Sequence, residues 1–418
     1  MRVLFINTTD TKGGAAIIAM RLMYSLEKYY DVKNFYLVRY QKGTIKSTST
    51  NSSRVGKLLE KIISKITDKL GLQYLFFPIS SRNIIRYAKL VKPDVISLHN
   101  THGGYFATPL LEKLSKIAPI VWTLHDMWSF TGNSAHTFGN ESWLYMKNDH
   151  NLTKIPPTIG LNYGAGLLKL KKRIYGNSDL HIVCPSKWLF QMAKQSPVFS
   201  GKQIKQIYNG LDQQVFKKLS KSECRLKHGL PLDGKIVMFA AEKIEAGNPW
   251  KGGADLLNIL KLMNQFSKDT LSLIVVGDTD NELFNGLSKL HVYGKGYVYD
   301  EYIVAELLNA ADLFIYPTRA DNLPNILIES ISCGTPCVTF DIGGNSEIIR
   351  NGINGFIIKP FDFPDFANKA LLILNDQKIY NEFSSASLNV ALRQFKDSDM
   401  AKRYFELFNQ IVANESYS

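Results

Sequence analysis

Two acidic residues eight positions apart, Asp321 and Glu329, are the side chains best suited to bind a hydroxyl-rich or anionic ligand. Asp321 opens a loop, and the segment 322–325 leads into a helical pattern that carries Glu329 into the same cleft. Free backbone N–H groups at a helix start bind anions. Carboxylates accept strong hydrogen bonds from sugar hydroxyls. The spacing alone also fits an ordinary capped helix with a solvated glutamate.

Two further groups of residues follow predicted strands. His99 and His102 lie three positions apart, as metal ligands can. No cysteine or carboxylate completes such a site, so an acceptor-binding or structural role is favoured over a metal site. Gly13 and Gly14 follow the first strand, but a glycine pair alone is not the GxGxxG fingerprint of a dinucleotide site.

The elements that must position these residues are short apolar strands alternating with helical stretches. The predicted strands are 3–6, 34–38, 95–98, 120–124, 180–184, 235–241, 271–276, 313–316 and 336–340. This alternation is typical of parallel sheets covered on both faces, whose ligands bind at the carboxyl ends of the strands. We therefore predict an α/β protein with two Rossmann-like domains, 1–207 and 208–397, facing a central cleft. A last helix at about 398–415 is a candidate to cross back to the first domain.

Composition excludes several classes of protein. A chain of 418 residues is long enough for two ordinary domains. Hydrophobic residues at 45% and charged residues at 21% exclude disordered and fibrous classes. No segment approaches the ~18 uninterrupted apolar residues of a membrane-spanning helix. Four cysteines without CxxC spacing exclude a disulfide scaffold, and they favour a soluble, reduced, cytoplasmic protein.

The net charge of +13 is divided unevenly along the chain. Residues 1–215 carry 29 basic and 12 acidic side chains, a net +17, and residues 216–418 carry 21 and 25, a net −4. Such asymmetry indicates an anionic partner for the first half. Nucleic acid and an anionic membrane are the two candidates, and solubility alone is the alternative.

The segment from Arg54 to Leu70 has the pattern of a basic amphipathic helix. One face is apolar, and lysines recur every four residues on another side, at positions 57, 61, 65 and 69. Four lysines near an anionic membrane would contribute about 1 kcal/mol each. The pattern therefore fits a membrane-surface helix, and it fits equally a helix whose apolar face packs on the domain core.

Several ordered blocks resemble the retaining glycosyltransferase family 4, which has the GT-B fold. The block Arg319–Ser330 resembles the family's Glu-x7-Glu signature, with Asp321 in place of the first glutamate. The block Trp122–Gly132, which reads WTLHDMWSFTG, is similar to one in the subgroup that serves bacterial surface polysaccharides, including colanic-acid-type transferases. Further matching blocks, spread over nearly the whole chain, are 5–16, 184–189, 208–216, 333–338, 343–347 and 351–355.

The resemblance implies roles for individual residues. Glu329 would hold the ribose of the donor nucleotide, and Asp321 would lie by the donor sugar's hydroxyls. Lys251 would bind the pyrophosphate, and His125 would lie near the reacting carbon. Asp126 would orient His125 or meet the acceptor on the side of His99 and His102. The implied catalytic residues are His125, Asp321 and Lys251; the implied donor-binding residues are Gly13, Gly14, Lys243, Lys251, Arg319, Asn322, Leu323, Pro324, Asn325 and Glu329.

One departure from the family concerns the phosphate site. Many members have an arginine shortly before the pyrophosphate-binding lysine, whereas here no arginine precedes Lys251 nearby. Lys243 or Arg319 could supply that second positive charge. The subgroup often has cysteines after the HDMW block, where this chain has Asn133 and its neighbours, so we expect neither a metal nor a disulfide there. We expect no cofactor, because the nucleotide-sugar is a substrate.

The expected function is that of a retaining, metal-independent hexosyltransferase in bacterial surface polysaccharide synthesis, such as capsule, O-antigen or exopolysaccharide. The donor would be a UDP- or GDP-sugar, and the acceptor a glycan, for which a polyprenyl diphosphate carrier fits both the resemblance and the charge. The protein would be cytoplasmic or peripheral on the inner membrane face, bound through residues 54–70. The alternatives are another sugar-nucleotide enzyme, such as an epimerase, and a basic nucleic-acid-binding protein. The latter explains the charge but none of the ordered blocks, so we expect no nucleic-acid partner.

Overall fold

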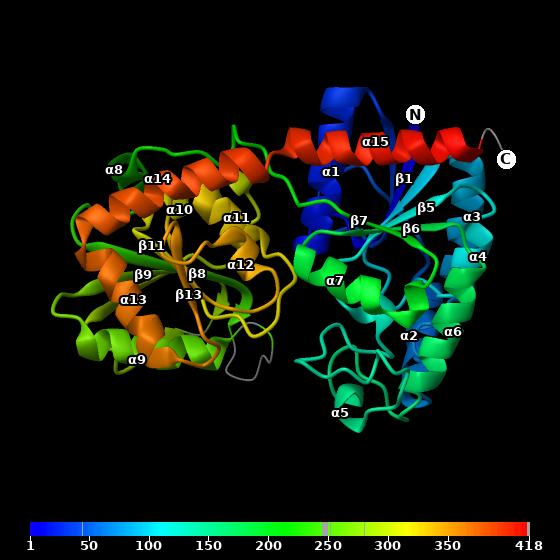
Figure 1. The fold of residues 1–418 in the computed structure, drawn as a ribbon, viewed down its shortest axis with the longest axis horizontal. Helices are drawn as coiled ribbons and strands as arrows, with labels where there is room; N and C mark the ends of the chain where they lie inside the picture. Colours follow the sequence, from blue (N-terminus) through cyan, green and yellow to red (C-terminus); the bar gives the residue numbers. More distant parts are fainter. Residues whose placement is uncertain (44, 245–249, 251, 280, 416–418) are drawn as a thin grey trace. The chain divides into compact units, whose positions relative to one another are not determined.

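The computed structural model describes residues 1–43, 45–244, 250, 252–279 and 281–415. The chain divides into two compact units (Figure 1). Unit 1 comprises residues 1–210 and 397–418, and unit 2 comprises residues 211–396. The chain therefore leaves unit 1 once, builds unit 2, and returns to unit 1 with its last helix.

Unit 1 is built on a seven-stranded sheet in the order β3-β2-β1-β4-β5-β6-β7, with every neighbouring pair parallel. Its strands are β1 (Arg2–Thr9), β2 (Lys33–Tyr40), β3 (Thr48–Ser49), β4 (Val95–Leu98), β5 (Ile120–Thr123), β6 (Leu180–Cys184) and β7 (Gln203–Gln206). From β1 the order runs outward in both directions. The crevice where ligands bind in such sheets therefore lies at the carboxyl ends of β1 and β4.

Helices cover both faces of this sheet. They are α1 (Gly14–Tyr30), α2 (Arg54–Lys69), α3 (Pro78–Val91), α4 (Leu110–Leu114), α5 (His150–Thr153), α6 (Gly164–Gly176), α7 (Lys187–Gln195) and α15 (Asp397–Glu415), with 3-10 turns η1 (Trp128–Phe130) and η2 (Pro197–Phe199). Alternate residues of β1 serve the two faces. Val3 and Phe5 pack in the cluster that includes α1 and α15, whereas Leu4 and Ile6 pack in the cluster on the opposite face.

The C-terminal helix packs on unit 1, as the sequence predicts. Figure 1 shows α15, in red, lying across α1, in blue. The rings of Tyr30 and Phe405 stack with centroids 4.3 Å apart. The buried hydroxyls of Thr123 and Tyr404 are hydrogen-bonded at 2.8 Å. The last helix is therefore an integral part of the unit formed by the start of the chain.

Unit 2 has a six-stranded parallel sheet in the order β10-β9-β8-β11-β12-β13. Its strands are β8 (Lys235–Ile244), β9 (Leu271–Thr279), β10 (Leu290–Gly294), β11 (Leu313–Tyr316), β12 (Cys337–Phe340) and β13 (Gly355–Ile358). Its helices are α8 (Lys221–Lys227), α9 (Gly253–Phe266), α10 (Glu301–Ala310), α11 (Asn325–Ser332), α12 (Asn345–Ile348), α13 (Phe363–Asn375) and α14 (Gln377–Gln394), with a 3-10 turn η3 (Asn281–Phe284). Here the order changes direction at β8 and β11.

The predicted fold class is confirmed. Each of the nine predicted strands corresponds to an observed one, and together they form the centres of the two sheets. The observed strands without a predicted counterpart are β3, β7, β10 and β13, which are the edges of the two sheets in the described chain. An edge strand buries less of its surface, so its apolar pattern is weaker.

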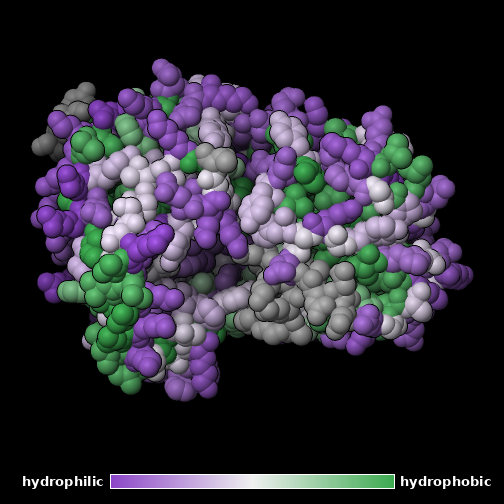
Figure 2. Space-filling model, turned by 180° about the vertical axis from the view of Figure 1, so that it is seen from behind, coloured by the Kyte–Doolittle hydropathy of each residue, from purple (hydrophilic) through white to green (hydrophobic). Residues whose placement is uncertain are grey.

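Helix α2 exposes its apolar face. The exposed fractions are 78% for Val55, 59% for Leu58, 47% for Ile62 and 54% for Ile66. The side of the helix that is buried carries Gly56 and Glu60 instead. Figure 2 shows the resulting mixture of apolar and hydrophilic surface at the lower left, where α2 lies. Core packing of the apolar face, one of the two predicted alternatives, is therefore wrong. Among the helices of the described chain, none is long and apolar enough to cross a membrane.

Candidate active site

In unit 1 the predicted histidines meet at the carboxyl ends of two neighbouring strands. His99 follows β4 and His125 follows β5, and these strands pair in parallel. His99 Nδ1 and His125 Nε2 are 3.0 Å apart, and His99 Nε2 lies 3.2 Å from the Ser97 hydroxyl. If Ser97 donates to His99, His99 donates to His125; in the opposite tautomers both bonds reverse. The three groups therefore form a hydrogen-bonded chain in which the tautomer of His99 sets the tautomer of His125.

Burial keeps both imidazoles of this chain neutral near pH 7. Burial lowers the pKa of His99 well below its usual value, and the adjacent His125 lowers it further. The pKa of His125 falls to about 4, chiefly through burial, although Asp126 acts in the opposite direction. A neutral imidazole can donate one hydrogen bond and accept another. His125 is thus suited to contact a substrate hydroxyl without carrying charge.

A second pair, His102 and Asp126, lies beside the first. His102 Nε2 is 2.6 Å from Asp126 Oδ2, and the backbone N–H of Trp128 donates to Asp126 Oδ1 at 2.8 Å. Burial alone would raise the pKa of Asp126, but His102 and the Trp128 N–H together bring it below its usual value. The Thr8 hydroxyl donates to the carbonyl of His102 at 2.8 Å, which ties this turn to β1. Asp126 is therefore held as a carboxylate beside an imidazole.

A buried lysine supports the turn that follows Asp126. Lys171 from α6 donates to the carbonyls of Trp128 and Thr131 at 2.6 and 2.9 Å. Its ammonium lies 3.8 Å from the centroid of the Trp128 ring. Burial lowers the pKa of Lys171 to about 7, partly offset by the charge of Asp126. Lys171 is a positioning residue for the turn 126–131.

In unit 2 the predicted loop lies at the carboxyl end of β11, next to β8 in the sheet. The carboxylate of Asp321 accepts hydrogen bonds from the Tyr316 hydroxyl at 2.7 Å and from the Asn322 N–H at 2.9 Å. Helix α11 then begins at Asn325, directly after Pro324. These bonds fix Asp321 at the point where the strand order of the sheet changes direction, which is where ligands of such sheets bind.

A glycine pair from a later motif supports this loop. Gly343 has φ +59°, and a Cβ there would lie 1.8 Å from the carbonyl oxygen of Asp321. The N–H of Gly344 donates to the carbonyl of Asn322 at 2.8 Å. A glycine is therefore needed at position 343, because two backbones approach closely there. This close approach explains why this block accompanies the acidic motif.

Glu329 lies on α11 and is buried, with 6% of its surface exposed. Burial raises the pKa of the neighbouring Cys333 thiol well above its usual value, and the charge of Glu329 adds to this effect. A carboxylate is costly to bury, so buried carboxylates near a crevice are candidates for binding. The solvated-helix interpretation of this residue does not fit its burial.

The predicted phosphate-binding charges have different outcomes. Arg319 Nε and Nη2 bond the carboxylate of Asp255 at 2.5 and 2.7 Å, and Asp255 is 1% exposed. Asp255 therefore orients Arg319. Lys251 lies outside the described residues, and Lys243 is described only as a backbone position of β8 that pairs with Asp278. Trp250 accepts a hydrogen bond from the Arg319 N–H at 2.9 Å.

The remaining predicted residues occupy positions consistent with loop roles. Gly13 precedes α1 with φ +91°, and a Cβ there would meet no heavy atom within 4 Å. Its requirement is thus one of backbone conformation. Leu323 is buried, and Asn325 begins α11. Within the described residues, no group of three histidine, cysteine, aspartate or glutamate side chains could hold a metal ion. Metal independence remains a prediction.

Sequence reasoning missed the residues that hold the site together. Ser97 lies two positions before His99, so strand alternation could have placed both on one face. Tyr316 at the end of β11 offered a similar signal. Lys171 and Asp255 offered none, because each finds its partners through the tertiary fold.

Both units match known family models. Residues 56–215 match the model described as Glycosyltransferase Family 4, and residues 234–376 match Glycosyl transferases group 1. Two α/β units, each built on a sheet of parallel strands, define a protein of the GT-B fold. The chain belongs to the glycosyltransferases of group 1 and family 4.

Curated relatives are distant. A Campylobacter jejuni N,N'-diacetylbacillosaminyl-diphospho-undecaprenol alpha-1,3-N-acetylgalactosaminyltransferase is 28% identical over 148 residues, 35% of this chain and 39% of the relative. An Escherichia coli UDP-Gal:alpha-D-GlcNAc-diphosphoundecaprenol alpha-1,3-galactosyltransferase is 29% identical over 112 residues, which are 27% of this chain and 29% of the relative. The chain spans about half, or less, of the length of such relatives.

Solved structures share the fold over nearly the full chain. Sucrose-phosphate synthase from Thermosynechococcus elongatus has a TM-score of 0.72 at 15% identity, with 99% of both chains covered. Anabaena HepE in complex with UDP and glucose has a TM-score of 0.69 at 17% identity, covering 98% of this chain and 100% of the other. These likenesses concern the fold.

Proposed function

We propose that this protein transfers a sugar, with retention of configuration, from a nucleotide-sugar bound by unit 2 to an acceptor bound by unit 1. The observation that carries the proposal is the loop between β11 and α11. It presents Asp321 and the buried Glu329 where the strand order of unit 2 changes direction. Such a crevice in a parallel sheet is where nucleotides bind. The HepE structure with UDP and glucose supports a UDP-sugar donor, with a GDP-sugar as the alternative.

The proposed roles follow from the chemistry of each group. Glu329 accepts hydrogen bonds from the ribose hydroxyls, and Asp321 lies by the hydroxyls of the donor sugar. The backbone at the start of α11, at Asn325, contributes N–H donors, whereas the Asn322 N–H holds Asp321 in place. Lys251 neutralises the departing diphosphate, because negative charge grows there as the bond to the sugar breaks.

The reaction we propose is a front-face displacement. The bond from the anomeric carbon to the phosphate oxygen breaks while the acceptor oxygen bonds on the same face, and a donor phosphate oxygen takes the acceptor proton. Neutral His125 contacts a sugar hydroxyl near the reacting carbon, and His99 fixes its orientation through the 3.0 Å hydrogen bond. Asp126 and His102 meet the acceptor. No step in this scheme requires a metal.

We further propose that the acceptor is a glycan on a polyprenyl diphosphate, reached at an anionic membrane surface. Two of the relatives carry diphospho-undecaprenol acceptors in their names. Helix α2 exposes an apolar face and carries Lys57, Lys61, Lys65 and Lys69. That combination is typical of a helix lying in a membrane interface. Surface polysaccharide synthesis at the inner face of the cytoplasmic membrane, as for capsule or O-antigen, is the setting this proposal implies.

The transferase activity is tested with a panel of UDP-, GDP-, ADP- and dTDP-sugars, scored by thermal shift and by slow donor hydrolysis. Glu329→Ala and Lys251→Ala should each reduce turnover at least ~100-fold, the range for lost transition-state contacts. Glu382→Ala, an exposed glutamate of the same unit, is the matched control. Near-wild-type rates in both site variants would contradict the assignment. A transferase should release nucleoside diphosphate much faster when the acceptor is present. Conversion of the nucleotide-sugar without release of nucleoside diphosphate would point to another sugar-nucleotide enzyme, such as an epimerase.

The membrane contact is tested by flotation with phosphatidylcholine vesicles, with and without phosphatidylglycerol. We expect binding that requires the anionic lipid. Ile66→Asp should abolish this binding, because a carboxylate replaces a 54% exposed apolar side chain of α2. Leu392→Asp on α14, where the leucine is 48% exposed, should leave it intact. Equal flotation with both lipid compositions would rule out the electrostatic contact.

A further inference from the structure

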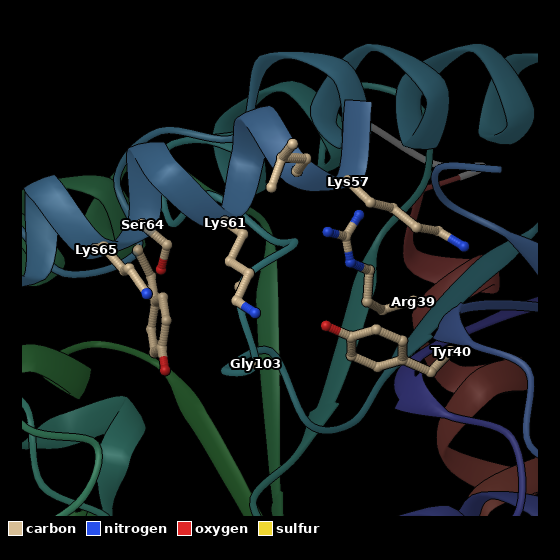
Figure 3. A pocket seen from close by; sticks show the side chains of 10 residues that line it. Arg39, Tyr40, Lys57, Lys61, Ser64, Lys65 and Gly103 are labelled. Atoms are coloured by element: carbon tan, nitrogen blue, oxygen red, sulfur yellow. The ribbon is translucent and has the colours of Figure 1, made fainter. Parts of the chain in front are cut away.

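A basic cavity of about 500 Å³ lies in unit 1 beneath α2. Figure 3 shows lysine side chains extending from α2 on one wall, with Arg39 and Tyr40 at the end of β2 facing them and Gly103 below. Its lining residues are Arg39, Tyr40, Lys57, Leu58, Lys61, Ser64, Lys65, Tyr74, Gly103 and Gly104. Among these lining residues of the described chain, none is acidic.

The charge of the cavity is set by the lysines. Arg39 is buried and its guanidinium pairs with Glu60 at 3.0 Å, so these two charges balance. Lys57, Lys61 and Lys65 then give the lining a net charge of about +3, with the Tyr40 hydroxyl nearby. The Ser64 hydroxyl donates to Asp68 at 3.2 Å, so one carboxylate lies beside the lining. Three ammonium groups around one cavity favour an anion with several oxygens. Each ammonium is a compact charge that can contact a different oxygen of the anion.

The geometry of this wall is built into the fold. Gly56 lets α2 approach closely, because a Cβ there would lie 2.8 Å from the Asn51 amide and 3.2 Å from Ile79. Glu60 accepts hydrogen bonds from the N–H and the hydroxyl of Ser80, both at 2.7 Å. These contacts fix the rotation of α2, so the lysines face the cavity while the apolar side remains exposed.

The floor of the cavity is adjacent in sequence to the candidate acceptor site. Gly103 and Gly104 directly follow His102, whose imidazole pairs with Asp126. Tyr74 packs against Trp128 with ring centroids 5.4 Å apart, and His102 lies 5.8 Å from the same ring. An anion in the cavity would therefore lie between the exposed apolar face of α2 and the His102–Asp126 pair.

We propose that this cavity binds the diphosphate of the lipid-linked acceptor. The prenyl chain then runs along the apolar face of α2, and the glycan extends past Gly103 toward His102 and Asp126. The inference rests on the proposed transfer to a lipid-linked acceptor. It adds a site that reads the charged group joining the lipid to the glycan.

The test compares lysines on one helix. Lys61→Gln/Lys65→Gln removes two charges from the cavity, whereas Lys69→Gln removes an exposed charge of α2 that does not line it. Binding of inorganic pyrophosphate and of farnesyl diphosphate is measured by calorimetry with UDP present in excess, so that the donor site is filled. We expect both probes to bind, farnesyl diphosphate more tightly. The double variant should weaken both at least ~10-fold, and Lys69→Gln should leave both within twofold.

Three results would overturn the proposal. Equal weakening by Lys69→Gln would mean general surface charge, and loss of pyrophosphate binding once UDP is present would mean binding at the donor site. Phosphatidylglycerol vesicles that compete fully with pyrophosphate would assign the cavity to a lipid headgroup. Donor hydrolysis measured on the same proteins separates the two proposals, because it tests unit 2 and does not depend on the cavity lysines.

Discussion

Replacing Glu60 by alanine should destabilise unit 1 by about 3–5 kcal/mol, because it breaks a buried ion pair. The Glu60 side chain is fully buried. Its carboxylate accepts hydrogen bonds from Arg39 Nη1 at 3.0 Å, from Asn51 Nδ2 at 3.1 Å and from the N–H and hydroxyl of Ser80 at 2.7 Å. One side chain thus joins α2 to β2 and α3.

The magnitude follows from what the substitution leaves behind. Arg39 is 3% exposed and keeps its charge, and its Nε already has no hydrogen-bond partner in the described chain. An uncompensated buried charge costs several kcal/mol. Each hydrogen-bond donor left unpaired costs about 1–3 kcal/mol, but part of this is already counted in the cost of the charge, so the two are not simply summed. Replacing both partners, as in Arg39→Met/Glu60→Leu, removes the unpaired charge. This double variant should recover most of the loss.

The assay is urea unfolding followed by tryptophan fluorescence, which reports mainly on unit 1 because four of the five tryptophans lie there. Glu27→Ala, at an exposed position of α1, is the control and should change the free energy of unfolding by less than about 0.5 kcal/mol. A Glu60→Ala protein within 1 kcal/mol of wild type would refute the reasoning. So would a double variant that is less stable than Glu60→Ala.

Three further predictions concern the candidate site. Lys171→Met should remove a pH dependence of the free energy of unfolding. The pKa of Lys171 is lowered to about 7 in the fold, so the unfolded wild type binds more protons than the folded protein between about pH 7 and 10.5. In urea unfolding, the stability of the wild type should therefore rise relative to that of the variant from about pH 6.5 to 9. Gly343→Ala should abolish donor binding and destabilise unit 2 by more than the roughly 1–3 kcal/mol that backbone strain alone would cost. The control is Gly352→Ala, at φ +71° with open space around it, which should show the cost of strain alone. Equal changes in melting temperature for the two variants would contradict the close contact at Gly343. His99→Leu should lower turnover about tenfold or more and leave the dissociation constant for the donor unchanged, because only the orientation of His125 is lost. Turnover within twofold of wild type would mean that the hydrogen bond between His99 and His125 does not contribute to catalysis.

Local patterns in the sequence were sufficient for the central strands of both sheets. Strands such as β4 and β11 are buried on both sides, so their four residues are all apolar or small and are bounded by turns. The edge strand β7 (Gln203–Gln206) has the sequence QIKQ and is partly exposed, so its hydrophobic pattern does not differ from that of a loop. Strand order was also beyond local pattern, although βαβ connections made a parallel sheet the expectation.

The candidate site was predictable in its parts but not in its contacts. The motifs named His99, His125, Asp321 and Glu329, and the sheet topology explains why the first two meet at adjacent strand ends. The pairing of Arg319 with Asp255 was not predictable, because 64 residues separate them and a second phosphate ligand was the expectation. Which charges are already paired depends on the folded chain.

Helix α2 shows most clearly where the sequence stops being informative. The sequence determined that residues 54–70 form a helix with an apolar face and a row of lysines, since that follows from the 3.6-residue period alone. Only the tertiary structure decided which side faces inward. The buried position of Glu60 is stabilised by Arg39 from β2 and Ser80 from α3. A carboxylate with those partners can be buried, so the apolar side chains remain at the surface. No local pattern contains that information, because the partners come from other elements of the fold.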